Sequence, residues 1–176
     1  QKSLKTENNK FMIFYFLGLV YFELRLLDKS IKFFNKSLKL RPNNISTYLK
    51  LASLYQTMGD IETSKDNFLK CIELDSNQIR SYYGLYQLKP KFLKDEYYNK
   101  IENISITSKE NSIDLAISKF LLSKFEIIKN NFREELTLLE DAHTTTFNSN
   151  LQYNKESDFY YKKIMKKFHN KIEYLN

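Results

Sequence analysis

A recurrence at intervals of 34 residues is the feature that most constrains the fold of this chain. Residues of the same size class stand at matching offsets in successive stretches: Phe14, Tyr48 and Tyr82; Leu17, Leu51 and Leu85; Tyr21 and Tyr55; Ser30 and Ser64; Phe34 and Phe68; Ser37 and Cys71; Leu40 and Leu74. A period of this length is typical of stacked helix–turn–helix repeats, each of which buries its apolar face against its neighbour. The best-formed repeat is 45–78.

The recurring residues also have the spacing of helices. Phe14, Leu17 and Tyr21 stand at i, i+3 and i+7, which places them on one face of a helix. Within 45–78 we predict a turn at Gly59, because glycine readily takes a positive φ after a helix, and a new helix from Asp60. The 176 residues include 3 Gly and 2 Pro, too few for the many turns of a β-rich fold. We therefore predict an all-α chain.

The decay of the pattern along the chain predicts how the domain is organised. We expect a tail at 1–10, repeats at 11–44 and 45–78, an irregular third repeat at 79–112, a degenerate fourth repeat at 113–149 and a C-terminal capping helix at 155–176. The end of a helix is the alternative to a tail at 1–10. Pro90 interrupts the third repeat. In the fourth repeat, Ile128 is one of the apolar members of the first helix, and we expect Leu136 on the inner face of the second. A polar linker expected over 144–154 leads to the capping helix, which would cover the apolar end of the stack.

The residues at the recurring positions resemble the tetratricopeptide repeat, whose pattern alternates large and small side chains at fixed offsets. In the first repeat the matching residues are Phe14, Leu17, Gly18, Tyr21, Ser30, Phe34, Ser37 and Pro42. In the second they are Tyr48, Leu51, Ala52, Tyr55, Ser64, Phe68, Cys71 and Ser76. The resemblance implies an α–α superhelix whose first helices line a concave face, and a scaffold that binds a partner protein or peptide on that face.

The resemblance also implies which residues face the partner. On the concave face we expect Tyr15, Leu19, Lys50, Ser53, Arg80 and Tyr83. The family members that bind chaperone C-termini have Asn at a position held here by Phe16, Lys50 and Gly84, which argues against that partner. The groove side of the first repeat is apolar. We expect it to be covered by a peptide, by residues 1–10 or by self-association through the first repeat.

The second half of the chain resembles the end of the repeat region in bacterial tetratricopeptide-containing sulfotransferases. The resemblance rests on the order of an irregular third repeat, a helix pair, a polar segment with Tyr153, and a helix over 159–168. It implies an alternative function, the recruiting region of a sulfotransferase. The catalytic domain of that enzyme, with its phosphate-binding loop, would then follow Asn176.

The sequence predicts no enzymatic activity, metal site or cofactor within this chain. His143 and His169 are its only histidines, and neither stands in a metal-ligand spacing. Cys71 takes a small-residue core position, where a buried thiol is inert. A single cysteine fits a reducing compartment, and no signal peptide is visible. The apolar run over 11–22 is shorter than the roughly 20 residues of a membrane span, so we expect a cytoplasmic protein without one.

The net charge of +7 suggests nucleic-acid binding as a third functional hypothesis. Lysines gather on one face of the expected capping helix: Lys162, Lys163, Lys166, Lys167 and Lys171. The positive charge is almost all lysine, whereas nucleic-acid readers rely on arginine for bidentate contacts. We therefore interpret these lysines as a solvated face and place nucleic acid behind a protein partner.

Overall fold

The computed structural model describes residues 2–149, and their side chains from residue 9 onward. The helices are α1 (Lys2–Glu23), α2 (Leu27–Leu40), α3 (Ile45–Met58), α4 (Ile61–Leu74), α5 (Ile79–Leu88), α6 (Tyr98–Thr107), α7 (Ile113–Ile128) and α8 (Phe132–Ser149). Two 3-10 turns, η1 (Pro90–Phe92) and η2 (Asp95–Tyr97), lie between α5 and α6. Residues 2–149 contain no strand, and the all-α prediction is confirmed for them. The expected capping helix at 155–176 lies outside the described residues.

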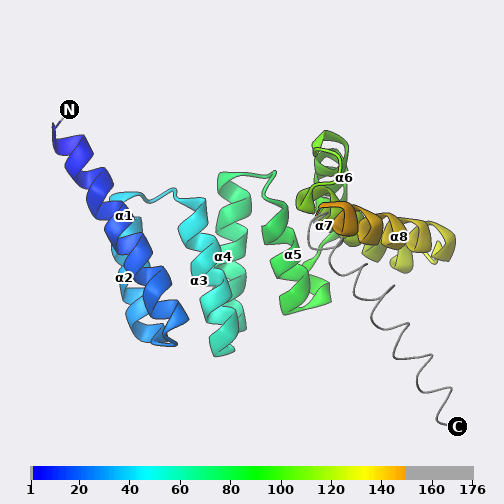
Figure 1. Ribbon diagram of the computed structural model, residues 1–176. Coiled ribbons are helices and arrows are strands. Elements are labelled where there is room, and N and C mark those ends of the chain that lie inside the picture. The colour runs from blue at the N-terminus through cyan, green and yellow to red at the C-terminus, as the bar shows by residue number, and fades with distance from the viewer. Residues whose placement is uncertain (1, 150–176) are drawn as a thin grey trace, which may run out of the picture. The chain divides into compact units, whose positions relative to one another are not determined.

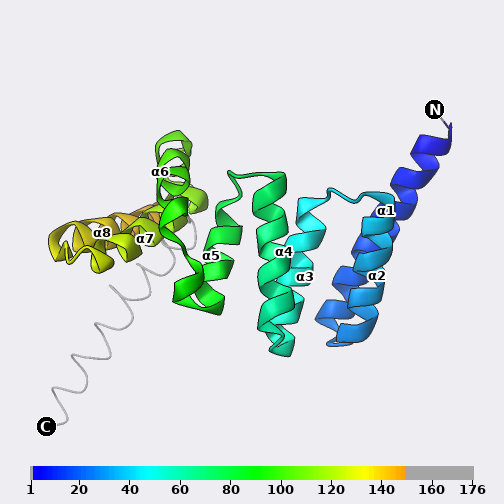
Figure 2. The same cartoon turned by 180° about the vertical axis from the view of Figure 1, so that it is seen from behind.

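The chain divides into two compact blocks, an N-terminal block up to Lys100 and a C-terminal block from Ile101. In the N-terminal block α1 lies beside α2 and α3 lies beside α4, and α5 follows in the same row (Figure 1). The view from behind shows the same order of helices (Figure 2). The first two helix pairs are the two regular repeats.

The same hydrogen bond holds each of these pairs together. Ser30 Oγ on α2 donates to the carbonyl oxygen of Gly18 on α1 at 2.8 Å. Thirty-four residues later, Ser64 Oγ on α4 donates to the carbonyl oxygen of Ala52 on α3, also at 2.8 Å. Both serines are fully buried, where a hydroxyl without a partner would cost stability. The sequence recurrence is therefore a recurrence of contacts.

Small residues on the first helices admit large rings from the second helices. A Cβ atom at Gly18 would lie 2.6 Å from the ring of Phe34, so only glycine lets α1 and α2 approach this closely. Phe34 is completely buried in a cluster with Leu51 and Leu54 of the next repeat. Burial of one such ring contributes about 1.5–3 kcal/mol, so this cluster ties the first repeat to the second.

The turns follow the chemistry expected of them, with one exception. Gly59 has φ +80°, and the Asp60 carboxylate accepts a hydrogen bond from Thr63 N at 3.1 Å to cap α4. Asn44 caps α3 in the same way, through Thr47 N at 2.8 Å. The turn of the first repeat has no glycine, and Arg25 takes the left-handed conformation there, with φ +59°.

The third repeat departs from the pattern at Pro90, as expected. Helix α5 ends at Leu88, and the chain passes through η1 and η2 before α6 begins. The completely buried Tyr82 ring meets the ring of Tyr97 edge-on at 5.2 Å, and its hydroxyl donates to Ser76 O at 2.9 Å. The contact between Tyr82 and Tyr97 thus packs the irregular segment before α6 against α5.

In the C-terminal block α7 and α8 form a helical hairpin. Ser112 caps α7 by accepting a hydrogen bond from Leu115 N, and Asn130 turns the chain with φ +57°. Leu121, Leu122, Phe125 and Ala142 are buried in this block. Leu136 is 58% exposed, so the prediction that it faces inward is wrong. Ile128, the last residue of α7, is 69% exposed.

Two helices are longer than the sequence pattern indicated. Helix α1 begins at Lys2, so residues 2–10 are helical, which agrees with the helix-end alternative and not with a tail. Helix α8 continues to Ser149, so the first part of the linker expected at 144–154 is helical. Buried Thr145 and the Thr146 hydroxyl, which donates to Ala142 O at 2.8 Å, belong to this extension. The polar composition of residues 144–149 suggested a linker, but these residues are helical.

Candidate functional site

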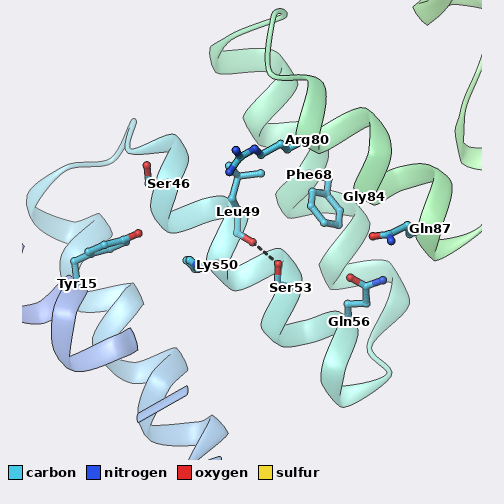
Figure 3. Close-up of a pocket in the computed structure, with 10 residues that line it drawn as sticks. All are labelled: Tyr15, Ser46, Leu49, Lys50, Ser53, Gln56, Phe68, Arg80, Gly84 and Gln87. Carbon is cyan, nitrogen blue, oxygen red and sulfur yellow. Dashed lines mark hydrogen bonds between the residues drawn. The ribbon is translucent and has the colours of Figure 1, made fainter. Parts of the chain in front are cut away.

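A groove of about 320 Å³ runs across the first helices of the three repeats in the N-terminal block. It is lined by Tyr15, Ser46, Leu49, Lys50, Ser53, Gln56, Phe68, Arg80, Gly84 and Gln87. Tyr15 comes from α1 and Phe68 from α4, while α3 and α5 supply the rest (Figure 3). The α3 residues stand at helical spacing, so one face of α3 forms the middle of the groove.

Gly84 has no side chain, and this lets the Phe68 ring form the floor of the groove. A Cβ atom there would lie 2.3 Å from Cζ of Phe68, closer than any side chain can approach. The corresponding positions in the earlier repeats carry Lys50 and Phe16. Because α5 has no side chain at this point, the Phe68 ring reaches the groove between α3 and α5, although it is 4% exposed (Figure 3). The floor is therefore apolar.

The charge of the groove is positive. Lys50 and Arg80 are its charged lining residues, both are exposed, and no carboxylate lines it. The other polar lining side chains are neutral: Tyr15, Ser46, Ser53, Gln56 and Gln87. Burial raises the pKa of Tyr15, so its hydroxyl stays neutral at physiological pH. The groove thus combines two cations, several neutral hydrogen-bonding groups and an apolar floor.

The lining offers no arrangement for nucleophilic catalysis. Ser53 Oγ donates to Leu49 O at 3.0 Å, so its proton is directed to its own helix (Figure 3). No histidine or carboxylate lies in the lining to act as its base. Burial raises the pKa of the Cys71 thiol to about 11, which keeps the thiol protonated.

The structure brings four of the six expected contact residues into the groove: Tyr15, Lys50, Ser53 and Arg80. Leu19 instead packs, half-buried, against the cluster of Phe34, Leu51 and Leu54. Tyr83 is half-buried and does not line the groove. That these residues bind a partner remains a prediction.

The other lining residues differ in how well the sequence could reveal them. Ser46, Leu49, Gln56, Gly84 and Gln87 occupy groove-side positions of the repeat, so the repeat register alone finds them. Phe68 holds a recurring large position on the second helix of its repeat, so the register does not place it on the groove side. Its access depends on Gly84, which lies 16 residues away on another helix, and no local pattern reports that contact.

The described residues contain neither a membrane-spanning helix nor a cluster of metal-ligating side chains. No helix within 2–149 is long and apolar enough to cross a membrane. No group of three or more metal-ligating side chains gathers in that part of the chain. His143 is exposed on α8, and His169 lies outside the described residues, as do the lysines expected at 162–171. Cytoplasmic localisation and nucleic-acid binding stay predictions.

Comparison with known proteins supports the repeat assignment. The model of the tetratricopeptide repeat matches residues 13–44 and 45–78. An N-terminal acetyltransferase A complex subunit-like protein of Schizosaccharomyces pombe is 28% identical over 174 residues, covering 90% of this chain and 25% of that protein. The Sol locus transcriptional repressor of Clostridium acetobutylicum is 29% identical over 90 residues, covering 51% of this chain and 28% of that protein. The chain thus spans about a quarter of the length of these relatives.

Two crystal structures of MamA share the fold. One aligns with a TM-score of 0.60 at 20% identity, covering 95% of this chain and 96% of that one. The other aligns with a TM-score of 0.58 at 19% identity, covering 82% of each chain. At such identities the likeness concerns the fold alone. None of these comparisons supports the expected resemblance to sulfotransferases.

Proposed function

Because residues 13–78 are two tetratricopeptide repeats, a kind of repeat that generally mediates contacts between proteins, we propose that this chain is a protein-interaction module whose groove binds an extended segment of a partner. The observation that carries the proposal is the groove itself. The first helix of each of three successive repeats contributes to it. Its lining includes cationic, neutral polar and apolar side chains. Such a lining can recognise a peptide through charge, hydrogen bonds and apolar contact.

The dimensions of the groove favour a short extended segment. Packed helices lie about 8–10 Å apart, so the span from α1 to α5 across α3 is about 20 Å. An extended chain rises about 3.3 Å per residue, so about six residues cover that distance. A segment of this length can contact Tyr15 at one end and Gln87 at the other, with an apolar side chain over Phe68.

The charge of the groove favours an acidic segment. Lys50 lies on α3 and Arg80 on α5, and both cationic side chains line the groove. Arg80 can hold a carboxylate with two parallel N–H···O bonds, and Lys50 can add a point charge beside it. We therefore expect the partner segment to carry aspartate or glutamate near its middle.

A matched pair of double variants tests the proposal. The 176-residue chain is titrated by fluorescence anisotropy against labelled octapeptides, one set with acidic residues at the centre and one with basic residues there. We expect the chain to prefer the acidic set, and Lys50→Ala/Arg80→Ala to weaken that binding at least tenfold, or about 1.4 kcal/mol.

Lys32→Ala/Lys39→Ala is the control, because it removes the same charge from exposed positions on α2 outside the groove. Equal loss in both double variants would mean that net charge, and not the groove, attracts the peptides. Equal affinity for acidic and basic sets would refute the charge argument. All four lysine and arginine side chains are exposed, so neither variant should alter folding.

A further inference from the structure

The equivalent phenylalanines of the two regular repeats pack their rings against glycines in different places. The ring of Phe34 lies against Gly18, on the first helix of its own repeat, where a Cβ atom would be 2.6 Å away. The ring of Phe68 lies against Gly84, on the first helix of the next repeat, where a Cβ atom would be 2.3 Å away. The second repeat has Ala52 at the position of Gly18, so its first helix leaves less room for a ring. The glycine that admits the ring is thus on the preceding helix in one repeat and on the following helix in the other.

This difference places an apolar surface in the groove between α3 and α5. One repeat earlier, Lys50 holds the position of Gly84, and Phe34 is completely buried and does not line the groove. Phe68 does line it, and Figure 3 shows its ring in the space between Leu49 on α3 and the backbone of α5. We call Leu49, Phe68 and Gly84 the anchor subsite.

The anchor subsite differs in chemistry from the rest of the groove. Among the described residues that line the groove, these three alone are apolar, and the remaining side chains carry a hydroxyl, an amide or a positive charge. Arg80 lies toward one end of the subsite, and Gln56 and Gln87 lie toward the other (Figure 3). A bound segment therefore has one place in which to bury an apolar side chain, with hydrogen-bonding groups on both sides of it.

We propose, as an extension that rests on the proposed peptide-binding function, that the partner segment carries one large apolar anchor residue whose side chain fills the anchor subsite. A few buried anchors supply most of the binding energy in protein interfaces. Acidic residues of the segment, attracted by Lys50 and Arg80, speed its association, whereas the anchor slows its dissociation. The partner is therefore an acidic segment with a single side chain of leucine size or larger.

Peptides that differ in one residue test the anchor. Acidic octapeptides carry leucine at one position outside the acidic centre, moved one position at a time, and the matched peptide has alanine at the same position. Each is titrated against the 176-residue chain by fluorescence anisotropy. We expect leucine to raise the affinity at least tenfold, or about 1.4 kcal/mol, at one position and to change it less than about threefold elsewhere. Equal affinity of the leucine and alanine peptides at every position would overturn the proposal.

Ser53→Phe tests the location of the anchor subsite, because a ring at this position fills the subsite from the protein side. Ser53 is exposed on α3 one turn after Leu49, and its hydroxyl donates to Leu49 O at 3.0 Å (Figure 3). The control is Thr57→Phe. Thr57 is also exposed on α3, lies outside the groove lining, and donates in the same way to Ser53 O at 2.9 Å. Both variants should keep the circular dichroism spectrum and melting temperature of the native chain.

The two variants should separate the leucine peptide from the alanine peptide. We expect Ser53→Phe to weaken binding of the leucine peptide about tenfold and binding of the alanine peptide less than about threefold, and Thr57→Phe to affect neither. If Ser53→Phe weakens both peptides equally, or neither, the anchor does not occupy this subsite and the inference fails. If the two peptides bind equally and Lys50→Ala/Arg80→Ala weakens both, the peptide-binding function stands without the anchor. If no peptide binds, the proposed function itself fails.

Discussion

Substitution of Gly84 by alanine sets two effects of known size against each other. Gly84 lies inside helix α5, where alanine would ordinarily stabilise the helix by about 1 kcal/mol. The added methyl group would lie 2.3 Å from Cζ of Phe68 and 2.4 Å from Cε1. No pair of carbon atoms tolerates such a distance, so either the ring or the helix must move.

The steric cost should be the larger of the two effects. Phe68 is 4% exposed, so its ring is held on its other sides and cannot simply rotate away. Overpacking of a well-filled core costs about 1–3 kcal/mol. After the gain in helix propensity, we expect Gly84→Ala to lower the free energy of unfolding by up to about 2 kcal/mol.

Urea unfolding followed by circular dichroism at 222 nm measures this difference. The control is the same substitution in a Phe68→Leu background, where the ring that causes the clash is absent. There Gly84→Ala should be neutral or stabilising, so the two substitutions should be strongly non-additive. If Gly84→Ala stabilises the native chain by the full increment of helix propensity, the contact between Phe68 and Gly84 does not hold α4 against α5, and the reasoning fails.

Three further predictions concern the buried contacts. Phe34→Ala should destabilise the chain by about 3–5 kcal/mol in thermal or urea unfolding, because it empties the contact between the first two repeats. Ser64→Ala should cost about 1 kcal/mol in the same assay, since it leaves the carbonyl oxygen of Ala52 without its 2.8 Å donor. At pH 8 the Cys71 thiol, whose pKa burial raises to about 11, should react with a thiol reagent far more slowly in the native chain than in urea.

The contribution of Glu126 to stability should depend on pH. The pKa of buried Glu126 is lowered by hydrogen bonds from Lys129 and Asn131, so this carboxylate stabilises the fold above its unfolded pKa of about 4.3 and stops doing so as the pH falls through its lower folded value. Glu126→Gln should therefore lower the melting temperature at pH 7 more than at pH 3.

Sequence reasoning succeeded where the determining contact recurs at a fixed spacing. The 34-residue recurrence correctly placed Ser30 and Ser64 at equivalent small positions, and each makes the same hydrogen bond 12 residues back along the chain. Gly59 could be assigned to a left-handed turn, because that conformation depends on the residue itself. The repeat register also found most of the groove lining. In each case the physical cause lies within one repeat.

The errors arose where the repeat pattern decays. Leu136 has the helical periodicity of an inner-face residue, yet it is 58% exposed near the start of α8. Periodicity shows which residues share a face of a helix. It does not show whether a neighbouring helix packs against every turn of that face. The polar sequence over 144–149 likewise indicated a linker, whereas α8 continues through it. Helix length there depends on packing against α7, which includes the Lys119–Asp141 ion pair at 2.8 Å.

The sequence by itself thus determined that this chain is built of helix pairs and which residues hold each pair together, because those contacts are short in sequence and repeat. The tertiary structure alone decided that Phe68 forms the floor of the groove beneath Gly84, and that Leu54 is buried while Val20 is exposed. Both facts concern which helix lies next to which residue after the repeats have stacked. Val20 and Leu54 hold the same position in successive repeats, and Leu54 is buried because it packs against Phe34 of the preceding repeat.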